Sequence, residues 1–154
     1  MQIPLTFAVI LPVPGLGGAM EEPGFRGFAP GRLEHRFGAV AGPLVLGALW
    51  VVWHGPLFLV GDIAWPDLIV MPAASVVIAS VFQLGRDSVL IAMVVHAMNN
   101  AVGGGYTSRL FHGSAAIRTN LLVAAGWTLL AVACSYAAAR SLCGTNGGRP
   151  QSWP

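Results

Sequence analysis

Hydrophobic residues in this chain form long runs that are separated by short stretches carrying the charges. A helix needs about 20 mostly apolar residues to cross a bilayer, and five runs approach this length. They lie at about residues 1–20, 39–60, 68–84, 88–105 and 119–139. The pattern therefore predicts an all-α, multi-pass integral membrane bundle with about four or five transmembrane helices.

Proline and glycine distinguish the five runs from one another. The first run contains three prolines and three glycines, so we expect a weak helix that begins late. In the second run, Pro43 stands where a first-turn proline is tolerated, whereas Gly55 and Pro56 disturb the far end. The third run is short and contains Pro72, the fourth ends in three glycines, and the fifth is the most regular.

The composition agrees with a bilayer as the natural solvent. Hydrophobic residues make up 55% of the 154 and charged residues only 9%, with a mean hydropathy of +0.70. Soluble domains carry about 25% charged residues, and a chain this small cannot hide the excess apolar surface inside itself. We expect a single membrane-embedded domain over residues 1–139 and a flexible tail over 140–154.

The charges exclude some protein classes and predict an orientation. All eight basic residues are arginine and the net charge is only +2, so a nucleic-acid binder, which would show a basic stripe, is excluded. If five helices alternate across the membrane, six arginines share one side, in the 21–37 loop, the 85–87 turn and the C-terminal tail. The positive-inside rule then places these segments and the C-terminus in the cytoplasm. No positive charge precedes Arg26, so a secretory signal peptide is not expected.

A few polar residues fall inside or beside the apolar runs, where each costs several kcal/mol unless it is paired or functional. They are Glu21, Glu22, His54, His96, Asn99 and Asn100. Three pairs are four residues apart and so share one face of a helix: Glu22 with Arg26, Trp50 with His54, and His96 with Asn100. Three helices can thus offer carboxylates, imidazoles and an amide to a common interior. These are the types of side chain that acid–base catalysis uses.

Each of these features also has a purely structural interpretation. Glu21, Glu22 and Arg26 can anchor a helix end at the headgroups, and His54 can bond a carbonyl freed by Pro56. His96 and its asparagines can join helices by hydrogen bonds. The tryptophans fit packing or the membrane interface better than a site: Trp50, Trp53, Trp65 and Trp127. That all three structural interpretations hold together is less expected than that any one of them holds alone. The sequence motifs of zincins, of serine hydrolases with a nucleophile elbow and of phosphate-binding loops are absent.

The polar residues fall into three motifs that resemble those of the CPBP intramembrane metalloproteases. This family comprises CaaX prenyl endopeptidases and bacteriocin-processing, Abi-like proteins. Residues 21–26, with Glu21, Glu22 and Arg26, resemble the Glu-Glu-x-x-x-Arg motif. Residues 50–54 are similar to Phe-x-x-x-His with tryptophan in the aromatic position, and residues 96–100 match His-x-x-x-Asn. Order and spacing agree over residues 15–105.

The resemblance implies an intramembrane endopeptidase in which an activated water attacks a peptide bond. Glu21 would be the base, assisted by His54, while Glu22 and Arg26 hold the carboxylate face. His96 and Asn100 would polarise the scissile carbonyl and stabilise the oxyanion. Glu21, His54 and His96 could also hold a divalent metal such as zinc with an open water position, or the residues could work without one.

The same resemblance implies a membrane-anchored or prenylated protein or peptide as substrate, membrane lipid as a partner, and a bacterial plasma membrane as the location. Two departures from the family pattern stand out: relatives usually have further helices before the first motif, and Pro23 could turn the glutamates out of register. The alternatives are an inactive scaffold or immunity protein of the same family, and a proton- or ion-handling membrane protein. Gly38 and Gly42 also have the small-x-x-x-small spacing of close helix contacts.

Overall fold

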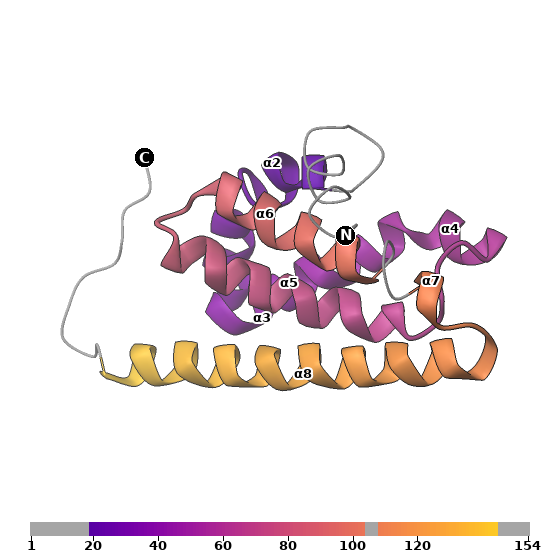
Figure 1. Cartoon of the computed structure of the whole chain (residues 1–154). Helices are drawn as coiled ribbons and strands as arrows, with labels where there is room; N and C mark the ends of the chain where they lie inside the picture. The colour runs from indigo at the N-terminus through magenta and orange to yellow at the C-terminus, as the bar shows by residue number, and fades with distance from the viewer. Residues whose placement is uncertain (1–18, 104–107, 145–154) are drawn as a thin grey trace.

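The structure is a computed structural model that describes residues 19–103 and 108–144, and this part of the chain consists of helices joined by turns, without a strand (Figure 1). The prediction of an all-α membrane bundle is confirmed. In order, the elements are η1 (Ala19–Glu21), α2 (Glu22–Phe25), α3 (Ala29–Trp53), α4 (Gly55–Val60), α5 (Asp67–Leu84), α6 (Val89–Asn100), α7 (Ser108–Leu110) and α8 (Gly113–Gly144). The first expected run, 1–20, lies almost wholly outside the described residues.

Helix α5 is the centre of the bundle. Seven consecutive residues, 73–79, are buried, because α3 and α8 pack on different sides of this helix and α6 follows it back across the bundle (Figure 1). Its Ile78 and Phe82 join Trp50 of α3, Ala92 of α6 and Ala124 of α8 in one core cluster. The side chains of α5 are mainly aliphatic, and residues 73–79 can therefore be buried on all sides at the centre of the bundle.

Helix α3 is interrupted at Gly38, whose φ of 86° and ψ of 166° are not helical. This backbone region is open essentially only to glycine. Beyond the break, a Cβ at Gly42 would lie 2.9 Å from the backbone nitrogen of Glu34, so the two arms of α3 fold closely against each other. The expected loop over 21–37 is therefore wrong for 29–37, which is helical. Gly42 makes a close contact, as its spacing suggests, but with another segment of the same chain. Gly38 forms the bend.

The second expected run, 39–60, also divides at its far end. Helix α3 ends at Trp53, His54 has non-helical angles (φ −85°, ψ 1°), and α4 begins at Gly55 with a proline in its first turn. Gly55 and Pro56 disturb the run as predicted, but a single span to residue 60 is wrong. Helix α4 has no buried residue, and its separation from α3 leaves His54 at a junction between two helices.

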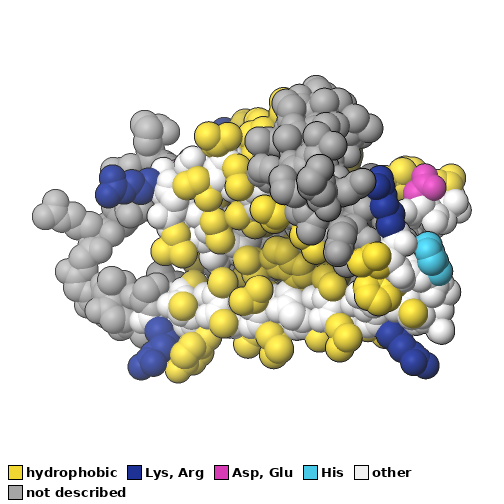
Figure 2. Space-filling model, viewed as in Figure 1, with side chains coloured by type: hydrophobic (Ala, Val, Ile, Leu, Met, Phe, Trp, Pro, Cys, Tyr) yellow, Lys and Arg dark blue, Asp and Glu magenta, His cyan; other side chains and the backbone are white. Residues whose placement is uncertain are grey.

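By length and composition alone, three described helices are long and apolar enough to cross a membrane: Ala29–Trp53, Asp67–Leu84 and Gly113–Arg140. The bend at Gly38 divides the first of them. A shorter apolar helix, Val89–Gly103, contains α6 and a π turn at 101–103. Only 11% of the most apolar window of the last span is buried. Figure 2 shows hydrophobic side chains along α8 with basic side chains near its two ends. Helix α8 continues to Gly144, so the first five residues of the expected tail, 140–144, are helical. The rest of the expected tail, 145–154, lies outside the described residues.

The structure places at one end of the bundle three segments that the alternating topology expects on one side of the membrane: the 29–37 arm, the end of α5 and the end of α8 (Figure 1). Arg26, which that topology counts in a loop, is instead buried. Gln83 donates from Nε2 to both carboxylate oxygens of Glu34, at 2.8 and 3.0 Å, which joins the 29–37 arm to the end of α5. The last residues of α8 lie at this same end of the bundle, and its first residues lie at the end of α4 and α7 (Figure 1). The side that faces the cytoplasm stays a prediction.

Candidate active site

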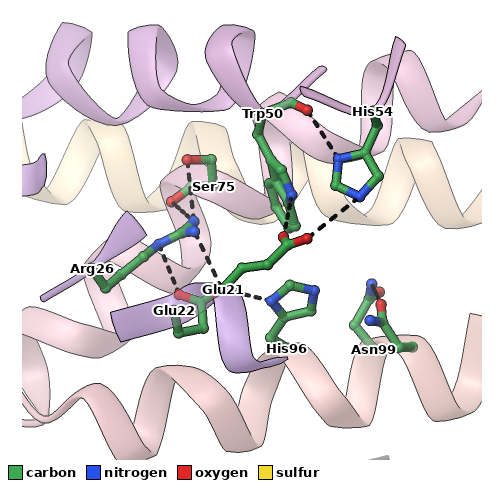
Figure 3. A network of polar contacts seen from close by, with 9 residues as sticks. Glu21, Glu22, Arg26, Trp50, His54, Ser75, His96 and Asn99 are labelled. Atoms are coloured by element: carbon green, nitrogen blue, oxygen red, sulfur yellow. Dashed lines mark hydrogen bonds and ion pairs between the residues drawn. The ribbon is translucent and has the colours of Figure 1, made fainter. Parts of the chain in front are cut away.

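The polar residues selected from the sequence converge in the middle of the bundle (Figure 3). Glu21 ends η1, Glu22 begins α2, and Arg26 follows α2 directly. Trp50 lies in α3, His54 stands after it, and His96 lies in α6. In Figure 3 the carboxylate of Glu21 lies between Trp50 and His54 on one side and His96 on the other. The expected common interior is therefore formed.

Three of these side chains make a fully buried group, which we call the inner cluster: Glu22, Arg26 and His96. Their exposures are 0%, 1% and 3%. Glu22 Oε1 accepts a hydrogen bond from Nδ1 of His96 at 2.6 Å and another from Nη1 of Arg26 at 3.3 Å. Arg26 Nε lies 3.2 Å from Oε2, close enough for an ion pair but not aligned for a hydrogen bond. A buried carboxylate needs such partners, because an unpaired charge is expensive there.

Arg26 has neighbours on every side of its guanidinium. Nη2 donates to the hydroxyl of Ser75 at 3.2 Å and to its carbonyl at 3.4 Å, and the guanidinium carbon lies 5.3 Å from the centre of the Trp50 ring. Burial lowers the pKa of Arg26, and the charges of Glu22 and Glu21 act in the opposite direction. Arginine is always charged in proteins, so the guanidinium is the positive partner of Glu22.

Glu21 and His54 form a second group, the outer pair, which is partly open. Their side-chain exposures are 25% and 16%. His54 Nδ1 lies 3.0 Å from the carbonyl oxygen of Trp50, and since a carbonyl only accepts, Nδ1 carries the proton. In the neutral ring, Nε2 then has the lone pair, and it faces Glu21 Oε1 across 4.0 Å. The carbonyl bonded is that of Trp50, not the one that Pro56 frees.

Trp50 connects the inner cluster with the outer pair. Its indole Nε1 donates to Glu21 Oε2 at 3.0 Å. Its ring meets His54 and His96 edge to face, with centroids 5.9 and 5.0 Å apart. The interpretation of Trp50 as a packing or interface residue is therefore incomplete, because this side chain also orients a carboxylate of the site. The spacing of four residues between Trp50 and His54 is the sequence feature that could have indicated this role.

Pro23 does not turn the two glutamates away from the histidines. It occupies the first turn of α2, where the missing N–H has no intrahelical partner to lose. Glu21 closes the preceding 3₁₀ turn, so the two neighbouring carboxylates leave the backbone in different directions. One reaches His54 and the other reaches His96.

Asn100 ends α6 one helical turn beyond His96, as the spacing predicts. Its side-chain oxygen accepts a hydrogen bond from Nδ2 of Asn99 at 3.3 Å. Both amides are half-buried, and Asn99 lies to the side of the carboxylates (Figure 3). The role of Asn100 at an oxyanion stays a prediction.

The residues expected to bind a metal are arranged differently from a three-ligand site. Across the described ranges, no group of three histidine, cysteine, aspartate or glutamate side chains comes together to hold a metal ion. Glu21 and His54 face each other, and Nδ1 of His96 is bonded to Glu22, which leaves Nε2 as the ring nitrogen able to act as a ligand. As placed, Glu21, His54 and His96 do not come together as a three-ligand zinc site, so the mechanism below is derived from the side chains themselves.

A family model described as type II CAAX prenyl endopeptidase Rce1-like matches residues 3–102. The chain belongs to this family. The Rce1-like match contains every residue of the inner cluster and the outer pair and ends before α7, which confirms the family indicated by the three motifs. No curated protein and no solved structure matched the chain.

Ser75 is a contact of the inner cluster that the sequence did not reveal. It is one of two serines in α5, a helix with no ionisable residue after Asp67. Serine is common in apolar helices, where its hydroxyl usually bonds the preceding turn. Only the packing of α5 on α3 shows that this hydroxyl faces Arg26 of the Rce1-like motif.

Proposed function

We propose that this chain is an intramembrane endopeptidase that hydrolyses a peptide bond with a water activated between Glu21 and His54. One observation carries the proposal: Glu21 Oε1 and His54 Nε2, two acceptors, face each other across 4.0 Å in a partly open position. Water can donate two hydrogen bonds of about 2.8 Å, so one molecule can reach both atoms. Membership of a protease family supports the same conclusion.

In this mechanism Glu21 is the general base. It takes a proton from the water as the water oxygen attacks the carbonyl carbon, and it returns that proton to the leaving amine. His54 accepts the second hydrogen bond of the water and fixes the direction of attack. The hydrogen bond from Trp50 holds the other oxygen of Glu21, so Oε1 is the oxygen presented to the water.

His96 and Asn100 act on the carbonyl oxygen of the substrate. Because Nδ1 of His96 is bonded to Glu22, Nε2 is the atom that the ring can direct to a substrate. With a proton on Nε2, this nitrogen donates to the developing oxyanion, and Asn100 Nδ2 supplies a second donor. A donor of this kind is worth about 100- to 1000-fold in rate.

The substrate that the family description suggests is a prenylated CAAX protein or peptide. The test uses the full chain reconstituted in lipid nanodiscs and a farnesylated CAAX peptide whose fluorescence rises on removal of its last three residues. The Glu21→Gln variant keeps the shape of the side chain but cannot accept the proton. The matched control is Glu34→Gln, because Glu34 bonds Gln83 at the other end of α3 and touches no residue of the site.

We expect the wild type and Glu34→Gln to cleave at similar rates. Glu21→Gln lowers kcat by at least about 100-fold, the contribution typical of a positioned base. Undiminished cleavage by Glu21→Gln would overturn the mechanism. Absence of cleavage by the wild type, with prenylated and unprenylated peptides alike, would favour the inactive scaffold, and proton flux into vesicles that stops in Glu21→Gln would favour the proton-handling alternative.

A further inference from the structure

The hydroxyl of Ser75 lies at a junction of three elements. Ser75 is fully buried in α5. Its Oγ donates to the carbonyl oxygen of Pro43 in α3 at 2.9 Å and accepts from Nη2 of Arg26 at 3.2 Å. A hydroxyl group can donate one hydrogen bond and accept others through its lone pairs. Here it does both, and the two hydrogen bonds fix its orientation. Ser75 therefore holds the guanidinium of Arg26 against the crossing of α3 and α5.

Gly47 makes this crossing close enough for the contact. A Cβ at Gly47 would lie 2.6 Å from Cα of Pro72 and 3.0 Å from Cβ of Ser75. Any larger residue would push α5 away from α3 at the level of Ser75. The short distance between Ser75 and the site thus follows from a glycine on the facing helix.

The position of Arg26 matters because its guanidinium shares an oxygen with His96. Glu22 Oε1 accepts from Arg26 Nη1 at 3.3 Å and from His96 Nδ1 at 2.6 Å. A guanidinium is planar, so fixing Nη2 at Ser75 also fixes the direction of Nη1 and Nε toward Glu22. A rotation of Arg26 would therefore change the hydrogen bond that orients His96.

We propose that Ser75 is a positioning residue of the reaction: its hydroxyl holds Arg26 so that Glu22 presents the shared oxygen to His96. This inference rests on the proposed function. Ser75 acts through Arg26 and touches no reacting atom. It therefore changes the rate of the chemical step and not the binding of the peptide.

The test compares Ser75→Ala with Ser80→Ala in nanodiscs. Both substitutions remove one hydroxyl from α5, but Ser80 Oγ donates to Val76 within the same helix, at 2.9 Å. We expect Ser75→Ala to lower kcat on the order of tenfold with KM unchanged, since it removes a hydrogen bond to a charged group. Ser80→Ala should match the wild type. Equal kcat values for the two variants would overturn the proposal.

A double-mutant cycle asks whether Ser75 acts through Arg26. Arg26→Lys keeps the charge but cannot reach Ser75 and Glu22 with one planar group. If Ser75 works through Arg26, Ser75→Ala has no further effect on kcat in the Arg26→Lys background. A purely structural Ser75 would lower kcat by the same factor in both backgrounds, and that result would contradict a positioning role.

The outcome is separable from that of the proposed function. If the wild type cleaves, Glu21→Gln does not, and Ser75→Ala equals the wild type, the protease mechanism stands and the inference on Ser75 fails. If the wild type does not cleave, the side-chain ¹⁵N resonances of His96 in histidine-labelled protein are compared at one pH. We expect Ser75→Ala to shift them and Ser80→Ala to leave them in place; unshifted resonances in Ser75→Ala would overturn the inference without reference to activity.

Discussion

Glu21 and Glu22 are neighbours in the chain, but their carboxylates meet different histidines. Glu21 Oε1 faces His54 across 4.0 Å at a partly open position, and Glu22 Oε1 bonds His96 at 2.6 Å where no surface is exposed. The 3₁₀ turn before α2 and the proline in its first turn produce this divergence. Two identical side chains therefore differ in burial, in partners and in expected effect on substitution.

Glu22→Gln should destabilise the protein far more than Glu21→Gln. The first change leaves Arg26 buried without its counter-charge, and breaking a buried pair costs about 3–5 kcal/mol. In the second variant the amide oxygen of the introduced glutamine can still accept from Trp50, so the loss of stability should be about 1 kcal/mol or less. Equilibrium unfolding by SDS in mixed micelles measures both free energies. If both variants lost the same free energy of unfolding, Glu22 would not be the buried, structural glutamate and Glu21 the open one.

Trp50→Phe should impair hydrolysis more than stability. Phenylalanine keeps an aromatic ring beside His96 and Phe25 but cannot donate to Glu21 Oε2. We expect kcat to fall about tenfold, because a hydrogen bond to a charged group is lost. Trp127→Phe is the control, since Trp127 of α8 packs against the core cluster. A similar fall in both variants would assign the effect to ring packing and not to the indole N–H.

Gly38→Ala should destabilise the bend in α3. Alanine is strained at φ 86° and ψ 166°, and such a backbone state costs about 1–3 kcal/mol. No atom from elsewhere in the described structure lies within 4 Å of a Cβ placed there, so the cost is conformational and not a clash with a packed neighbour. Gly31→Ala, in the helical arm before the bend and equally open, should be neutral or stabilise by about 0.5–1 kcal/mol. A Gly38→Ala variant that is more stable than Gly31→Ala, as measured by the free energy of unfolding, would contradict the bend.

Chelation should leave the reaction intact. Glu21 and His54 face each other, and no third metal ligand joins them in the described part of the chain. Peptide cleavage by protein treated with 1,10-phenanthroline should match that of untreated protein. A loss of cleavage that added zinc restores would show that the side chains rearrange around a metal.

The sequence predicted the helices that a simple apolar period or a spacing of four residues can reveal. The runs that became α5, α6 and α8 were found, and Glu22 pairs with Arg26 as their spacing suggested. The order of the three motifs led to the family. Each of these features depends on residues close together in the chain, where helix geometry alone determines which side chains are neighbours.

Features that depend on distant segments were not predictable in this way. A glycine such as Gly38 can sit in a helix or break it, and the choice depends on how Glu34 packs on Gly42 after the chain has turned. The role of Ser75 depends on a crossing with Gly47, 28 positions earlier. The unlike surroundings of Glu21 and Glu22 depend on α3 and α6 arriving from opposite sides.

The length of α8 has a consequence for the lipid around this protein. Arg118 and Arg140 are 22 positions apart in one helix, or about 33 Å at 1.5 Å per residue, close to the hydrocarbon thickness of about 30 Å. Helix α5 has 18 residues, about 27 Å by the same rise. The lipid-facing helix therefore matches an ordinary bilayer while the central helix is shorter. Bilayers of shorter or longer acyl chains should create a hydrophobic mismatch at α8 and alter how water reaches the outer pair.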